Sequence, residues 1–102
     1  MAGIGAAIGY GMQKFHEAMG ALIGLGSIQE RLRRAHVQLS QPAFKPEHHL
    51  PEGLRADFAE LMENLDRAEG LDDDEAFALA RRVRDMAGEV DRAYFEWEFR
   101  SR

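Results

Sequence analysis

The sequence has no cysteine, only three prolines among 102 residues, and no apolar run of the length that crosses a membrane. The absence of cysteine excludes a disulfide framework, a thiolate nucleophile and a zinc site with cysteine ligands. A spanning helix needs about 20 predominantly apolar residues, and polar residues interrupt the apolar N-terminal stretch well before that length. No basic residue precedes this stretch, so it is a poor signal peptide. These absences predict a cytoplasmic protein.

Composition points to one folded domain. Hydrophobic residues make up 45% of the chain and charged residues 30%, which is typical of a globular protein and not of a disordered one. The net charge of −5 argues against nonspecific binding to nucleic acid. Most of the acidity lies in residues 51–75. This segment contains ten acidic residues and only two basic ones, Arg55 and Arg67, so its net charge is −8.

The spacing of apolar residues predicts an all-α fold. Steps of three and four residues favour helices near residues 12–25, 27–39, 51–69 and 72–100. We expect a small four-helix bundle in which the C-terminal helix is the longest. Residues 12–102 would form a single helical domain, preceded by a glycine-rich flexible or contact segment at residues 1–11. The apolar stripe of the last helix is expected to comprise Ala76, Ala80, Val83, Ala87, Val90, Tyr94 and Trp97, widened by Phe77, Leu79, Met86 and Phe95.

Two local patterns mark helix starts. Ser27 followed by Glu30, and Asp72 followed by Glu75, have the spacing of a capping box. Gly70 is expected to end the third helix. In the first helix Phe15, Leu22, Ile23 and neighbouring apolar residues are expected to share a face. The connector at residues 40–53 holds all three prolines, and Phe44 and Leu50 are predicted to fix it to the core.

The glycine-rich start allows three interpretations. Glycine disfavours a stable soluble helix, so residues 1–11 are expected to be frayed or loosely packed. Gly5 and Gly9 have a small-xxx-small spacing, as do Gly20 and Gly24, which suits the close approach of another helix. The composition also resembles the glycine-rich amphipathic peptides of amphibian skin, which implies a membrane contact through residues 1–26. Gly5, Ile8 and Gly9 are the candidates for a membrane or helix contact.

Three segments resemble a family of short, uncharacterised bacterial helical proteins. They are Gly-Ser-Ile-Gln-Glu-Arg-Leu at 26–32, Leu-Pro-Glu-Gly-Leu-Arg-Ala-Asp-Phe at 50–58, and Asp-Asp-Glu-Ala at 73–76 with the helix that follows. The resemblance covers about residues 12–95. It implies a helical fold and no particular activity.

No group of residues predicts catalysis or a bound cofactor. The four histidines, His16, His36, His48 and His49, lack the spacing of a metal site, and we expect solvated or capping roles. Glu47 with His48 or His49 would make an acid–base pair, but no nucleophile accompanies them. The acids at residues 72–75 lack the glycine of a calcium-binding loop and suit a helix N-terminus better. We therefore expect a protein that is not an enzyme and has no metal or cofactor.

The sequence contains two basic clusters besides the acidic third helix. They are Arg31-Arg33-Arg34 and Arg81-Arg82-Arg84. A nucleic-acid site needs one continuous positive stripe with exposed aromatic residues. Pairing with the acidic helix, within the chain or between chains, explains these clusters better. A nucleic-acid partner is therefore not favoured.

Phe95 and Phe99 lie four residues apart, on a different face from Tyr94 and Trp97, which continue the core stripe. A helix with two apolar faces needs two partners, and the second would be the N-terminal segment or another chain. The sequence therefore predicts a non-enzymatic interaction module, a homodimer or a small bacterial or phage accessory or inhibitor protein. The expected contact surface is Phe95 and Phe99, the acidic face of Asp57, Glu60, Glu63 and Asp66, or both. The alternatives are a membrane-associated protein acting through residues 1–26 and an acidic inhibitor that mimics nucleic acid.

Overall fold

The computed structural model describes residues 3–100, and side chains from residue 6 onward. Within this range the chain is entirely helical apart from its connections, which confirms the all-α prediction. The long helices are α1 (Gly3–Ile23), α2 (Ile28–Leu39), α4 (Glu52–Asp66) and α5 (Asp73–Arg100). The short helix α3 (Pro46–His49) lies in the connector, and a 3-10 turn, η1 (Ala68–Gly70), follows α4.

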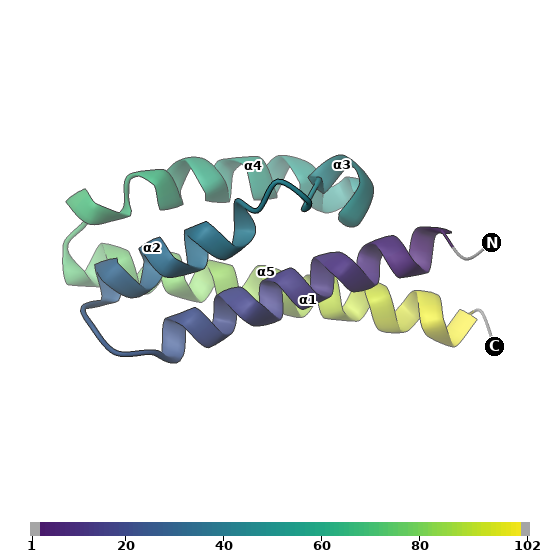
Figure 1. Cartoon of the computed structure of the whole chain (residues 1–102), viewed down its shortest axis with the longest axis horizontal. Helices are drawn as coiled ribbons and strands as arrows, with labels where there is room; N and C mark the ends of the chain where they lie inside the picture. The colour runs from purple at the N-terminus through teal and green to yellow at the C-terminus, as the bar shows by residue number, and fades with distance from the viewer. Residues whose placement is uncertain (1–2, 101–102) are drawn as a thin grey trace.

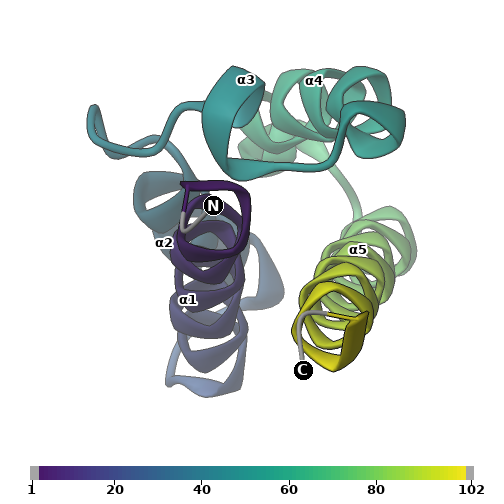
Figure 2. The ribbon, with the colours of Figure 1, turned by 90° about the vertical axis from the view of Figure 1, so that its right-hand side faces the viewer.

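The four long helices alternate in direction along one axis (Figure 1). The molecule measures 45 × 21 × 20 Å, and α5 spans almost the whole of its long dimension. Viewed from the end, α1 and α2 form one side, α3 and α4 a second, and α5 the third (Figure 2). Both described ends of the chain lie at the same end of the bundle (Figure 1).

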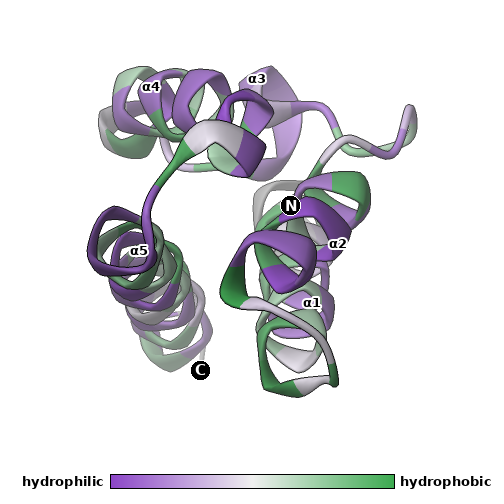
Figure 3. Ribbon diagram, turned by 90° about the vertical axis from the view of Figure 1, so that its left-hand side faces the viewer, coloured by the Kyte–Doolittle hydropathy of each residue, from purple (hydrophilic) through white to green (hydrophobic). Residues whose placement is uncertain are grey.

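All four long helices contribute to one core. Hydrophobic and hydrophilic residues alternate around each of them, as an amphipathic helix requires (Figure 3). Phe44 and Leu50 are buried, so the connector is fixed to the core as predicted. The fully buried large side chains are those of Phe15, Leu32, Leu50, Leu61, Val83 and Val90.

Four residues expected in apolar faces are exposed instead, and one of them, Phe95, is 58% exposed. Ile23 is 81% exposed because α1 ends there and the chain turns away from the core. Leu25, in the turn itself, is 92% exposed. Phe77 is 45% exposed because it lies on the side of α5 that faces away from α1 and α4, beside the stripe that holds Ala76 and Leu79.

Helix α1 begins at Gly3, well before the predicted start near residue 12. Long-range packing explains the difference. A Cβ atom on Gly9 would lie 3.2 Å from the Tyr94 ring, and one on Gly11 only 2.2 Å from the His49 carbonyl oxygen. These glycines let α1 approach α5 and α3 closely, and this packing outweighs the low helix propensity of glycine.

Both predicted N-caps position their helices, and the one at Asp72 forms the full reciprocal capping box, whereas the one at Ser27 forms its hydroxyl half. The Asp72 carboxylate accepts a 2.8 Å bond from the Glu75 N–H, and Glu75 accepts a 3.2 Å bond from the Asp72 N–H. At α2 the Glu30 N–H donates to the Ser27 hydroxyl over 3.1 Å. Gln29 donates to the Leu71 carbonyl and the Asp73 carboxylate, both at 3.0 Å, and so joins the start of α2 to the start of α5.

The glycines near these turns differ in role. Gly26, before the Ser27 cap, has a φ of 105°, a conformation that favours glycine. Gly70 was predicted to end the third helix, but α4 ends at Asp66 and the φ of Gly70 is not positive. The C-terminus of α4 instead tightens into the 3-10 turn η1, where the Gly70 N–H bonds the Arg67 carbonyl over 3.1 Å.

Candidate interaction surfaces

The C-terminal part of α5 has packing partners on one side only. Helix α5 contains 28 residues, whereas α2 and α4 contain 12 and 15. It therefore extends beyond both of them and continues beside the N-terminal half of α1 (Figure 1). Beyond Val90 no residue of α5 is fully buried. The outer side of this segment is open to solvent.

Phe95 and Phe99 lie on that open side, 58% and 81% exposed. A shallow groove of about 330 Å³ runs between Arg92, Phe95, Glu96, Phe99 and Arg100. The N-terminal segment was one expected partner for these rings. It packs against a neighbouring face instead, where Gly9 lies against half-buried Tyr94.

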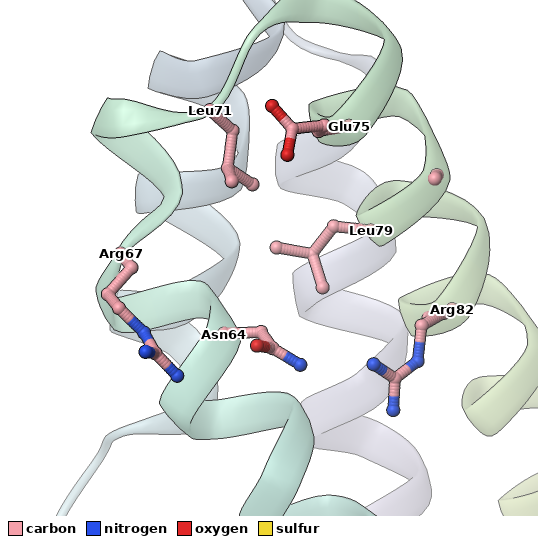
Figure 4. Close-up of a pocket in the computed structure, with 7 residues that line it drawn as sticks. Asn64, Arg67, Leu71, Glu75, Leu79 and Arg82 are labelled. Carbon is pink, nitrogen blue, oxygen red and sulfur yellow. The ribbon is translucent and has the colours of Figure 1, made fainter.

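A second groove, of about 460 Å³, lies between α4 and the start of α5 (Figure 4). Leu71 and Leu79 point into it, and Arg67 and Arg82 flank its opening. Its floor already belongs to the fold, because Leu79 is only 5% exposed and Leu71 packs against the core. Sequence reasoning did not find this groove, since its walls come from residues that each look like ordinary helix or turn positions.

The acidic face of α4 is exposed as predicted from its spacing. Asp57, Glu60, Glu63 and Asp66 all point to solvent. The Glu60 carboxylate lies 3.7 Å from the Arg82 guanidinium, and Glu69 pairs with Arg33 at 2.8 Å. Both pairs are exposed to solvent, so each contributes little to stability. Some of the predicted pairing between basic clusters and acidic residues therefore occurs within one chain.

Arg31 and Arg34 have a role that the sequence did not reveal. The Arg31 guanidinium donates to the Leu22 carbonyl over 3.1 Å, and Arg34 donates to the Leu25 carbonyl. Arg31 therefore satisfies a carbonyl group at the C-terminal end of α1, and Arg34 satisfies one in the turn that follows. This part of the first basic cluster therefore caps a helix, a role that depends on the tight α1–α2 turn.

His49 is the one histidine built into an aromatic cluster. Its ring lies 4.6 Å from that of Tyr10 and stacks on Phe44 at 5.9 Å. Its Nδ1 accepts a 2.8 Å bond from the Lys45 N–H, so this nitrogen carries no proton. Burial among these groups lowers the pKa of His49, and the neighbouring His48 lowers it further. The folded protein therefore favours neutral His49.

The lowered pKa of His49 makes stability depend on pH. The unfolded chain binds a proton near pH 6.5, whereas folded His49 takes it up only at lower pH. The contribution of neutral His49 is complete above that pH and declines as the pH falls below it. We expect the free energy of unfolding of the natural protein to fall more between about pH 7.5 and about pH 5.5 than that of His49→Asn. Asparagine can still accept the Lys45 N–H but does not titrate.

Urea unfolding followed by circular dichroism at both pH values measures this difference. The other three histidines are common to both proteins, so their contributions cancel. A stability difference that stayed constant across the two pH values would contradict the burial of neutral His49.

The other predicted chemical groups remain dispersed. His16 bonds the Asp91 carboxylate of α5 over 2.8 Å, a contact between helices that holds α1 against α5. Among residues 3–100 no group of three or more histidine or acidic side chains is placed to hold a metal ion. None of the described helices is both long and apolar enough to span a membrane. Ile8 is half-buried in the bundle, and the surroundings of Gly5 lie outside what the structure describes.

Comparison with known proteins gave no match: no family model, curated protein or solved structure is similar to this chain. The resemblance of residues 26–32, 50–58 and 73–76 to short bacterial helical proteins stays a prediction.

Proposed function

We propose that this protein is a non-enzymatic interaction module that associates through the outer side of α5 near its C-terminus. The observation that carries the proposal is the exposure of Phe95 and Phe99, 58% and 81%, one helical turn apart beside a groove. Large apolar side chains gathered on an open surface are typical of protein contacts, and aromatic residues supply much of the binding energy at such sites.

The other surfaces support an interaction less strongly. The apolar floor of the α4–α5 groove is already packed against the core, so a ligand there would gain little apolar burial. The acidic face of α4 offers charge without an apolar centre, and charged rims contribute more to association rate and specificity than to affinity. The apolar face of α1, on which a membrane contact would depend, contributes Phe15, Ala18 and Leu22 to the core.

Photocrosslinking in cells of the native host tests the proposal. A benzoylphenylalanine side chain at position 99 reports on the outer side of α5, and the same group at position 63 reports on the acidic face of α4. We expect a discrete adduct of higher mass from position 99 and none from position 63. The adduct is expected to disappear when Phe95 is replaced by serine, because Phe95 lies in the same groove.

Mass spectrometry of the adduct then identifies its second member as another copy of this chain or a different protein. An adduct from position 63 alone would move the contact to the acidic face of α4. No adduct from either position, or one from position 99 that persists in Phe95→Ser, would overturn the proposal.

A further inference from the structure

A single exposed stripe runs along α5 from Phe77 to Phe99. At 100° per residue its members fall within an arc of about 80°, on the side of the helix opposite the core. All are exposed to solvent. The stripe comprises Phe77, Arg81, Arg84, Gly88, Arg92, Phe95 and Phe99.

Gly88, at the centre of the stripe, has no role in the fold of one chain. A Cβ atom placed on it would meet nothing within 4 Å, and its φ is not positive. Glycine within a helix is less favourable than alanine, so this position weakens α5 without any internal benefit. Glycine does allow another helix backbone to come close at that point.

The positions of the stripe are spaced symmetrically around Gly88, at steps of four, three and four residues on each side, although the residue types at positions 81 and 95 differ. Phe77 lies 11 residues before it (88 − 77 = 11) and Phe99 lies 11 residues after it (99 − 88 = 11). In an antiparallel pair of α5 helices related by a two-fold axis at Gly88, residue i lies opposite residue 176 − i of the second copy. Phe77 then lies opposite Phe99, Arg81 lies opposite Phe95, and Arg84 falls at the level of Arg92 on the other flank. The first two would make an aromatic pair and a contact between a cation and an aromatic ring.

The charges beside the stripe are complementary in the same register. In such a pair the same flank of each helix meets its equivalent. Asp85 lies opposite position 91 of the second copy, only one residue, or about 1.5 Å along the axis, from Arg92. Glu96 lies opposite position 80, one residue from Arg81 of the second copy. On the other flank Arg84 lies one residue from Asp91, whose Oδ1 atom bonds His16. Each opposite-charge pair occurs twice by symmetry.

We propose that two copies of this chain pair antiparallel through the outer face of α5, with the two-fold axis at Gly88. This inference rests on the proposed function and adds the identity of the partner. Phe77 of the second copy covers the groove beside Phe95 and Phe99. The contact from Phe77 to Phe99 is about 33 Å long, most of the 45 Å length of the molecule. An interface of that length suits a dimer whose protomers are already folded.

Sedimentation equilibrium of the full chain over a range of concentrations tests the pairing. We expect the natural protein to form a dimer and Gly88→Ala to raise the dissociation constant at least about tenfold, because two Cβ atoms enter the closest contact. The same substitution is expected to raise the melting temperature of the monomer, measured at protein concentrations low enough for the dimer to dissociate. Gly20→Ala is the matched control, since Gly20 also lies exposed in a helix with nothing within 4 Å of an added Cβ.

A charge exchange tests the register. Asp85→Arg and Arg92→Asp are each expected to weaken the dimer by placing like charges together, and the double variant to restore it. The two residues are seven positions apart, too far to pair within one chain. Recovery in the double variant therefore requires a contact between copies.

If the natural protein remained monomeric in sedimentation at every concentration, the pairing of two copies would be overturned. If position 99 crosslinked to a different protein, the proposed function would still stand. A dimer that Gly88→Ala and the charge exchange leave unchanged would overturn the pairing described here. Failure of crosslinking at position 99 would overturn both.

Discussion

Replacing Phe15 with alanine is expected to lower the free energy of unfolding by about 3–5 kcal/mol. The ring is fully buried and makes edge-on contacts with Phe58 at 5.9 Å and Phe44 at 6.4 Å. It therefore joins α1 to both the connector and α4. A domain of this size has a total stability of about 5–15 kcal/mol, so the variant would lose a large share of it. Urea unfolding followed by circular dichroism measures the loss.

Phe99→Ala is the matched control for this prediction. It removes the same number of atoms from a side chain that is 81% exposed. Measured at a concentration where chains do not associate, it is expected to change the free energy of unfolding by less than about 0.5 kcal/mol. Equal losses in the two variants would show that Phe15 does not occupy the centre of the core.

Gly11→Ala is expected to destabilise the protein by about 1–3 kcal/mol even though alanine is the better helix former. The added Cβ would lie 2.2 Å from the His49 carbonyl oxygen and 3.2 Å from the carbonyl carbon. A backbone group cannot rotate away as a flexible side chain can, so α1 and α3 must separate. Thermal unfolding by circular dichroism reports the change.

Gly20→Ala in the same helix gives the opposite expectation. A Cβ at that position would meet nothing within 4 Å, so alanine should stabilise the protein by about 0.5–1 kcal/mol. The pair of variants separates helix propensity from close packing, because both changes are chemically identical. Stabilisation by both would mean that α1 does not approach α3 as closely as the structure shows.

Features set by neighbouring residues could be predicted from the sequence. The Ser27 and Asp72 caps depend on bonds spanning only three residues, and the structure confirms both. Local chemistry decides these two caps, so no knowledge of the rest of the fold was needed. The prediction that Phe44 and Leu50 fix the connector to the core is also confirmed.

Features that depend on distant contacts could not be predicted in this way. The early start of α1 depends on His49 and Tyr94, which lie 38 and 85 residues beyond the glycines they approach (49 − 11 = 38; 94 − 9 = 85). The exposure of Ile23 depends on where α1 ends, and that of Phe77 on how α5 turns toward its neighbours. The symmetric spacing of the stripe around Gly88 is present in the sequence, but its meaning requires knowing which side of α5 remains uncovered.

The pairing of the first helix with the last sets the order in which this chain completes its fold. The bond between His16 and Asp91 joins residues 75 positions apart. During synthesis α1 and α2 emerge together and can form a helical hairpin, whereas the side of α1 that receives α5 stays uncovered until nearly the whole chain has been made. Contacts so distant in sequence form slowly relative to local ones. Completion of the core therefore waits for α5, and nascent chains arrested before it expose apolar surface that chaperones and proteases recognise.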